Sequence, residues 1–290
     1  MSRRATVIEA WANRAVAEDE SGRLVAFHLP RRMERPLPGQ TVEVNARDEL
    51  SAVVAPRNRF GRGDPRGRFK AIAVDLDQAL IVIAPRPAPS PDLIHRYLAA
   101  CHLCDVRPIV VLNKSDLPLP DQPPFDELDT LESLGYPILR TQCRPVAEIG
   151  TLAGLLAGKT TLIAGQSGVG KTSLVNALIP DLEAQTGALS TVTGKGKHTT
   201  TSARVHRLPD DGRLVDTPGV WEFGLWAMPA TELIHGFPEF LPWRDRCRFR
   251  DCSHRQEPGC AVRAAADLGN LPRCRYQAWL RLQGEQARLR

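Results

Sequence analysis

The sequence contains no long hydrophobic run. Of its 290 residues, 42% are hydrophobic and 6% are aromatic, and no apolar stretch approaches the roughly 20 residues that are needed to cross a bilayer. The first residues, from Met1 onward, reach the charged Glu9 without the apolar core of a signal peptide. The composition also excludes collagen-like and disordered chains. We therefore expect a cytoplasmic protein that has no contact with a membrane and that is a monomer.

Cysteines are few and odd in number. The count of seven argues against a disulfide framework. Cys101 and Cys104 lie in an amphipathic stretch with no two further ligands nearby, so we expect buried helix thiols, and we expect Cys274 to serve packing. Three other cysteines and one histidine lie close together in the chain: Cys247, Cys252, His254 and Cys260. Three thiolates and one imidazole suit tetrahedral Zn²⁺, and a closed set of this kind is structural rather than catalytic.

The net charge of +5 is unevenly distributed along the chain. Residues 1–70 hold 14 Lys and Arg against 9 Asp and Glu, residues 244–290 hold 11 against 5, and the middle holds 13 against 19. Two basic ends therefore flank an acidic middle, and nucleic acid is the obvious partner for such ends, although each arginine alone is more often a solvated surface residue. The arginines that gather near the two ends are Arg31, Arg32, Arg35, those of 57–68, Arg244, Arg246, Arg248, Arg250 and Arg255. Aromatic side chains that could stack on bases are few.

The composition and hydrophobic pattern of the sequence change twice along the chain. Short alternating runs at 23–29, 41–44 and 50–54 predict a small all-β unit, a barrel or a sandwich. Residues 56–70 are rich in Gly, Pro and Arg, which predicts a mobile basic linker. From residue 71, apolar runs alternate with amphipathic stretches, which predicts a mostly parallel sheet covered by helices on both faces. After residue 223 the pattern becomes helical.

One segment fits the phosphate-loop pattern G-x-x-x-x-G-K-[ST] in full. An apolar strand at 161–164 precedes it and a helix at 173–179 follows it, which is the context that this motif requires. The glycines let backbone N–H groups surround phosphates at a helix N-terminus. Lys171 would reach the β- and γ-phosphate oxygens, and the Thr172 hydroxyl would hold Mg²⁺. The nucleotide-binding residues of this loop are Gly165, Gln166, Ser167, Gly168, Val169, Gly170, Lys171, Thr172 and Ser173.

Two further motifs follow short apolar strands. Asp216-Thr217-Pro218-Gly219 places an acidic residue where a metal is expected, and the Gly219 N–H could contact a γ-phosphate. Asn113-Lys114-Ser115-Asp116 follows the strand 109–112. Its aspartate can accept two hydrogen bonds from guanine, which adenine cannot offer, so the site would reject the wrong base.

The order of these motifs is unusual, because Asn113 to Asp116 precede the phosphate loop instead of following it. A sheet can be assembled with its strands joined in another order, so the permutation does not prevent a common site. A Gly/Thr/Lys segment at 193–202 separates the phosphate loop from Asp216, and one of its threonines could complete the Mg²⁺ shell. Val220 stands where Ras-like GTPases have a glutamine that orients water, and His198 is the nearest candidate for that task, although a lone loop histidine is usually only solvated.

At this point the chain resembles the circularly permuted GTPases of the RsgA type, which assist small ribosomal subunit biogenesis. The resemblance rests on motifs in a fixed order, at 75–78, 113–116, 165–173, 196–201 and 216–219, followed by the Cys/His cluster. It implies an OB-fold RNA-binding domain at 1–68, a circularly permuted α/β P-loop GTPase domain at 69–223 and a mainly helical zinc-binding domain at 224–290. Thr141-Gln142-Cys143 stands where the family has a small, serine-rich stretch beside the guanine.

The resemblance also implies a function and residue roles. It implies ribosome-stimulated GTP hydrolysis, binding of the small (30S) subunit and its 16S rRNA, and late subunit maturation with release of assembly factors. The implied cofactors are one Zn²⁺ per subunit and Mg²⁺ with GTP. It assigns His198 to catalysis and Thr200 to magnesium.

Two alternatives remain beside this interpretation. An ATP-using P-loop enzyme would bind ATP and GTP alike. A non-catalytic RNA-binding scaffold with a vestigial nucleotide site is the second, and Val220 favours it because valine cannot orient water.

Overall fold

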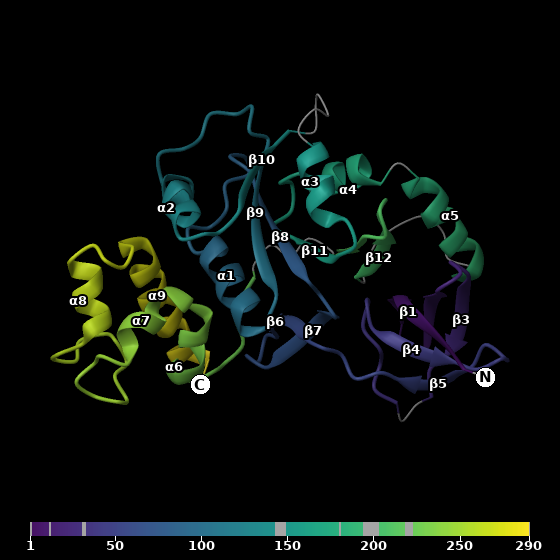
Figure 1. Ribbon diagram of the computed structural model, residues 1–290, viewed down its shortest axis with the longest axis horizontal. Coiled ribbons are helices and arrows are strands. Elements are labelled where there is room, and N and C mark those ends of the chain that lie inside the picture. Colours follow the sequence, from purple (N-terminus) through teal and green to yellow (C-terminus); the bar gives the residue numbers. More distant parts are fainter. Residues whose placement is uncertain are drawn as a thin grey trace.

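The computed structural model describes three consecutive groups of elements (Figure 1). The described residues are 2–11, 13–30, 33–142, 149–179, 181–193, 203–217 and 223–289. None of the helices within these ranges is both long and apolar enough to cross a membrane.

The N-terminal group is a five-stranded antiparallel sheet in the order β3-β2-β1-β4-β5. Its strands are β1 (Arg3–Ala10), β2 (Arg14–Asp19), β3 (Leu24–His28), β4 (Thr41–Val44) and β5 (Leu50–Val53). The all-β prediction is confirmed for these residues, and the predicted strands correspond to β3, β4 and β5. The alternating sequence pattern missed β1 and β2. Both strands are buried almost throughout, on both faces of the sheet, so their sequences show little alternation of apolar and polar residues.

Residues 56–70 correct one expectation. They contain most of an antiparallel hairpin, β6 (Arg59–Gly63) and β7 (Phe69–Val74), where a mobile linker was predicted. Phe60 is buried and stacks on Phe223, with ring centroids 6.0 Å apart. Aromatic burial against a distant part of the chain orders a segment that its local Gly and Arg content made look mobile.

The central group is a six-stranded sheet in the order β10-β9-β8-β11-β13-β12, parallel except for β12. The strands are β8 (Gln78–Ile83), β9 (Arg107–Asn113), β10 (Ile138–Thr141), β11 (Thr160–Ala164), β12 (Arg204–Arg207) and β13 (Arg213–Asp216). The helices are α1 (Leu93–Leu103), α2 (Leu128–Ser133), α3 (Ile149–Leu156), α4 (Lys171–Leu178) and α5 (Leu182–Thr193). One face of the sheet packs on α1, α2 and the C-terminal group, and the other packs on α3 and α4. This confirms the predicted parallel sheet with two covered faces.

The C-terminal group is helical, as predicted. Its helices are α6 (Ala230–Leu233), α7 (Leu241–Arg244), α8 (Ala261–Asp267) and α9 (Arg273–Leu289), with short 3₁₀ turns at Ile234–Gly236 and Pro238–Phe240. Trp279 is fully buried against Phe237 and Phe240. Arg275, also fully buried, pairs with Glu239 and hydrogen-bonds to His95 of α1. A continuous core and a buried charge network therefore fix this group to α1.

Candidate functional site

The three nucleotide motifs predicted from the sequence meet at one edge of the central sheet. Asn113 ends β9, the phosphate loop follows β11, and Asp216 ends β13. These strands are parallel, so their carboxyl ends share an edge, which is where ligands bind in open α/β sheets. The permuted motif order therefore does not separate the motifs in space.

The phosphate loop has a backbone that only glycine accommodates. Gly165 has a φ of +143°, and a Cβ atom there would lie 2.3 Å from the carbonyl oxygen of Val82. Gly170 has a φ of +98°, and its Cβ would lie 2.2 Å from Nδ2 of Asn113. Both glycines are thus required by close approach as well as by conformation. Helix α4 begins directly after Gly170 and leaves Thr172 and Ser173 exposed in its first turn.

Lys171 folds back over the loop that precedes it. Its Nζ donates to the carbonyl oxygens of Gly165 at 2.8 Å and of Gln166 at 2.7 Å. Burial lowers the pKa of this ammonium, and the nearby Asp216 carboxylate opposes that shift. The lysine therefore spans the loop and holds a positive charge where phosphate oxygens would lie.

The Asn113 motif braces the same loop. Asn113 is buried and donates from Nδ2 to the carbonyl oxygen of Val169 at 2.8 Å, while Thr141 donates to its Oδ1 at 3.2 Å. Lys114 donates from Nζ to the carbonyl oxygens of Gly168 and Arg86, both at 2.8 Å. The first two residues of the motif thus fix the phosphate loop in place.

Asp116 has an exposed side chain on the loop that follows β9. This position leaves its carboxylate accessible to a base, and two acceptor oxygens match the two donors on one edge of guanine. Thr141 lies beside Asn113, and Gln142 is half-buried. Cys143 lies outside the described residues, so this wall of the pocket stays a prediction.

The residues predicted to hold Mg²⁺ offer oxygen donors, which this hard cation prefers. Asp216 is the last residue of β13, and burial raises the pKa of its carboxyl group, while the charges of Lys171 and Arg204 lower it. Thr172 presents its hydroxyl at the start of α4. The chemistry of this pair fits the ion.

Several predicted residues lie outside the described ranges: His198, Thr200, Gly219 and Val220. Their assigned roles stay predictions. Helix α5 leads into the segment that holds His198 and Thr200, and β12 follows it.

The segment that follows β8 also contacts the phosphate loop and Lys114, which the sequence did not predict. Pro87 accepts a 2.8 Å hydrogen bond from Nε2 of Gln166, and Arg86 accepts the bond from Lys114. Both contacts are to backbone carbonyls, which carry no residue-type signature. The one available signal was that β8 ends at the same edge as the phosphate loop.

The Cys/His cluster gathers its four donor atoms within 4.8 Å of one another. His254 Nδ1 lies 3.5 Å from the Sγ atoms of Cys247 and Cys260, which are 4.0 Å apart. Bonds of about 2.3 Å for Zn–S and about 2.0 Å for Zn–N in a tetrahedron place two sulfurs about 3.8 Å apart and sulfur and nitrogen about 3.5 Å apart. The donor set is therefore compatible with zinc in both chemistry and spacing.

The surroundings of the cluster suit a metal as well. The backbone N–H groups of Ala261 and Arg263 each donate to a cluster sulfur at 3.3 Å, to Cys247 and Cys260 respectively. Burial lowers the pKa of His254 and so favours the neutral imidazole that binds metal. Burial raises the pKa of Cys252 to about 12, so the thiolate form depends on a cation to stabilise it. Cys274 stands outside the cluster, and Cys101 and Cys104 are buried, as predicted.

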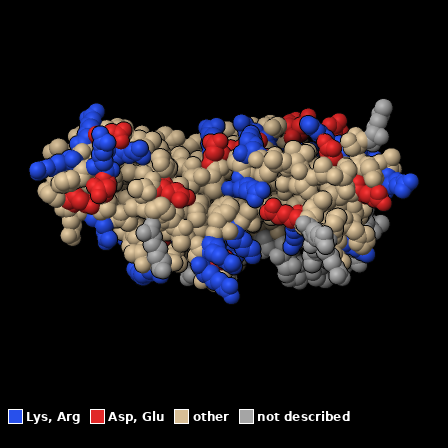
Figure 2. Space-filling view, turned by 90° about the horizontal axis from the view of Figure 1, so that it is seen from below, with Lys and Arg blue, Asp and Glu red and all other residues tan. Residues whose placement is uncertain are grey.

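Basic side chains gather over the C-terminal group, at the left of Figure 2. The guanidinium of Arg246 lies 5.2 Å from the ring centroid of Trp243, and that of Arg248 lies 5.5 Å from Phe249. Phe249 is 41% exposed. This surface offers positive charge beside aromatic faces, a combination that suits phosphate and unstacked bases.

Comparison with known proteins gives one consistent result. The family model described as RsgA GTPase matches residues 54–226. A Chromohalobacter salexigens protein named small ribosomal subunit biogenesis GTPase RsgA is 40% identical over 91% of this chain and 79% of its own length. A protein of the same name from Haemophilus influenzae is 36% identical over 97% of this chain and 84% of its own length.

Solved structures agree in fold. The crystal structure of YjeQ from Thermotoga maritima superposes with a TM-score of 0.76 at 27% identity and covers 99% of each chain. The structure of YloQ, a circularly permuted GTPase, gives a TM-score of 0.75 at 24% identity and covers 100% of this chain and 96% of its own.

Proposed function

Because the chain belongs to the RsgA GTPase family, we propose that it acts on the small (30S) ribosomal subunit. In this proposal it binds the subunit and its 16S rRNA and hydrolyses GTP during late maturation, when assembly factors are released. Its relatives from Chromohalobacter salexigens and Haemophilus influenzae are named small ribosomal subunit biogenesis GTPases, which supports the ribosomal part of this proposal. The observation that carries the proposal is the contact between the Asn113 motif and the phosphate loop, through the 2.8 Å bond from Asn113 to Val169.

The GTPase chemistry follows from the residues at this edge. Asp116 selects guanine, and the loop N–H groups and Lys171 bind the β- and γ-phosphates. Thr172 and Thr200 would hold Mg²⁺ with Asp216 nearby, and the ion would neutralise charge at the phosphate oxygens. Val220 stands where Ras-like GTPases have a glutamine, so His198 orients the attacking water instead. Gly219 contacts the γ-phosphate. GTP binding turns Lys171 from the carbonyls of its own loop to the phosphates.

The flanking groups bind RNA in this proposal. We assign residues 1–68 to an OB-fold, supported by the strand order β3-β2-β1-β4-β5, which a five-stranded OB barrel shares. Residues 69–223 form the GTPase domain and residues 224–290 the zinc domain. One Zn²⁺ bound by the four donors of the cluster orders the loop that carries Arg246, Arg248 and Phe249. We also propose that the protein works as a monomer in the cytoplasm.

The test measures hydrolysis of GTP, ATP and xanthosine triphosphate by the full chain, with and without purified small ribosomal subunits. We expect GTP to be preferred and its turnover to rise with subunits. Asp116→Asn should transfer preference to xanthosine triphosphate, because an amide donates to the carbonyl that xanthine carries in place of the guanine amino group. Asp121→Asn, an exposed aspartate on the same loop, is the matched control and should behave as the wild type.

Two results would favour the alternatives. Equal use of ATP and GTP, unchanged by Asp116→Asn, would indicate an ATP-using enzyme. Subunit binding without any nucleotide hydrolysis, with His198→Ala indistinguishable from the wild type, would indicate a scaffold with a vestigial site.

A further inference from the structure

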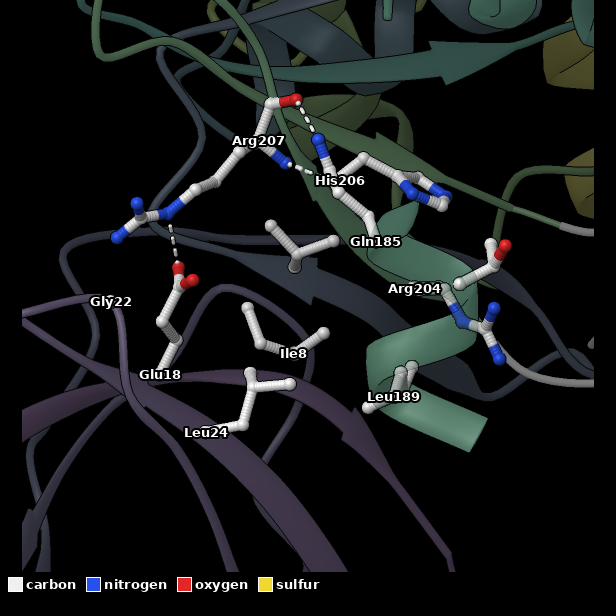
Figure 3. A pocket seen from close by; sticks show the side chains of 11 residues that line it. Ile8, Glu18, Gly22, Leu24, Gln185, Leu189, Arg204, His206 and Arg207 are labelled. Atoms are coloured by element: carbon white, nitrogen blue, oxygen red, sulfur yellow. Dashed lines mark hydrogen bonds and ion pairs between the residues drawn. The ribbon is translucent and has the colours of Figure 1, made fainter. Parts of the chain in front are cut away.

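Two arginines of strand β12 are bound by acidic residues of the N-terminal sheet. Arg204 donates from Nε at 3.0 Å and from Nη2 at 2.8 Å to Oε2 of Glu9 on β1. Arg207 donates from Nε to Oε2 of Glu18 on β2 at 2.7 Å, a contact drawn in Figure 3. Both ion pairs join the N-terminal sheet to the edge strand of the central sheet.

The carboxylates of these pairs are buried and therefore depend on their partners. The side chains of Glu9 and Glu18 are 6% and 9% exposed. A buried carboxylate that loses its cation keeps the full cost of leaving water, so separation of either pair is strongly unfavourable. The two pairs therefore hold the N-terminal sheet at a defined position on β12.

Helix α5 is attached to the same strand. Gln185 donates from Nε2 to the backbone oxygen of Arg207 and accepts from its N–H, both at 3.1 Å (Figure 3). Leu189 of α5 and Val205 of β12 are buried with Ile8 of β1 in one apolar cluster. Helix α5, strand β12 and the N-terminal sheet thus form one contact region.

This region contacts both elements that flank residues 194–202. Helix α5 ends at Thr193 and β12 begins at Arg204. Strand β12 pairs with β13, and Arg204 lies opposite Asp216 in that register. Both elements that flank the segment carrying His198 therefore contact the N-terminal sheet, α5 on β3 and β12 on β1.

The packing within this region is incomplete. A cavity of about 150 Å³ lies between the two sheets, lined by residues of both, including Ile8, Leu24 and Val205. Beside the apolar contacts, the ion pairs therefore add directional contacts between the two surfaces. The C-terminal group belongs to the same apolar core through Trp279 and is also held by the fully buried Arg275.

We propose that the Glu9–Arg204 and Glu18–Arg207 pairs are positioning contacts for GTP hydrolysis. They hold α5 and β12 in the arrangement that turnover requires, so that hydrolysis depends on the N-terminal sheet even without a ribosome. A displacement of about 1 Å in a catalytic group can lower a rate by about a hundredfold, so loss of one pair is sufficient to be measured. Guanine and phosphate binding draw on β9 and β11, which do not neighbour β12 in the sheet, so we expect loss of a pair to leave the affinity for GTP nearly unchanged.

The experiment measures intrinsic GTP hydrolysis by full-length variants without ribosomal subunits. Glu9→Gln and Glu18→Gln should each lower kcat about tenfold and leave KM for GTP within about twofold of the wild type. The double reversal, Glu18→Arg with Arg207→Glu, should restore kcat to within about threefold. Amide hydrogen exchange across 203–217 should rise in the single variants and return in the double variant, a readout independent of activity.

The matched control is Glu285→Gln, which removes the ion pair with Arg96 between α9 and α1. This variant breaks an ion pair between the C-terminal group and α1 and should leave kcat unchanged. The reversal uses the Glu18–Arg207 pair because Arg207 is 50% exposed and pairs with Arg213 in the strand register, whereas Arg204 lies opposite Asp216.

Three results would overturn the inference. They are single variants whose kcat stays within twofold of the wild type, parallel changes in kcat and KM, and a folded reversal that restores exchange protection without restoring kcat. Because ribosomal subunits are absent, these outcomes do not depend on the proposed ribosomal role.

Discussion

Acid should weaken this protein through His206, a buried histidine on β12. The residue is 7% exposed and lines the cavity between the two sheets together with Glu18, Arg204 and Arg207. Burial lowers the pKa of His206 from 6.5 to about 4, and the positive charge of Arg204 adds to the shift. The neutral imidazole is therefore the form that the folded protein accepts.

The direction of the effect follows from the two protonation states. The unfolded chain binds a proton at His206 below about pH 6.5, whereas the folded chain does so only near pH 4. The contribution of the neutral His206 to the stability of the fold is therefore complete above pH 6.5 and is lost as the pH falls toward 4. Between pH 7.5 and pH 5.0 this single group lowers the free energy of unfolding by about 2 kcal/mol, with a limit of about 3 kcal/mol at lower pH.

The test compares urea denaturation of the wild type and His206→Phe at pH 7.5 and at pH 5.0. Phenylalanine keeps an aromatic ring at this buried position, but it cannot bind a proton. The difference in unfolding free energy between the two proteins should therefore shift by about 2 kcal/mol in favour of the variant at pH 5.0. His28→Asn, at an exposed position on β3, is the control and should show no such shift. An identical difference at both pH values would refute the reasoning.

Three further predictions concern the glycine loop, the metal cluster and the C-terminal core. Gly165→Ala should weaken GTP binding at least tenfold in a fluorescent-nucleotide titration, because its Cβ meets a backbone oxygen at 2.3 Å, whereas Gly154→Ala in α3, with nothing within 4 Å and no left-handed φ, should bind GTP normally. Cys252→Ser should lose the bound zinc measured by metal analysis, and Cys274→Ser should retain one zinc per chain. Arg275→Met should lower the free energy of unfolding by about 3–5 kcal/mol in urea denaturation, because it leaves a buried carboxylate unpaired; a loss under 1 kcal/mol would show that the network is not needed.

The nucleotide site could be predicted because its chemistry is local in sequence. The glycine spacing, the lysine and the strand before them fall within one short segment, and the structure places Gly165, Lys171 and Asn113 at one edge. The grouping of the Cys/His cluster was predictable for the same reason, since its four residues fall within one short segment. In each case the informative residue types and their spacing lie close together in the sequence.

The contacts between the groups of elements could not be predicted in this way. Glu9 and Arg204 are 195 positions apart, and no spacing or composition connects two such residues. The hairpin β6–β7 was missed because its order comes from Phe60 packing on Phe223, far along the chain. Similarly, β1 lost its alternation because a second sheet covers it. All three features depend on contacts between distant parts of the chain, which a local sequence pattern does not contain.

The long-range contacts give the N-terminal residues access to both segments expected to surround the γ-phosphate. The first segment, 194–202, is flanked by α5 and β12, which the N-terminal sheet holds through Glu9 and Glu18. The second, 218–222, is followed by Phe223, whose ring is stacked between Phe60 of the hairpin and Tyr97 of α1. The hairpin also pairs with this exit through the 2.9 Å bond from the Gly63 N–H to the Gly224 oxygen. We therefore expect a structural change in the N-terminal sheet or in the hairpin to alter GTP hydrolysis through both segments.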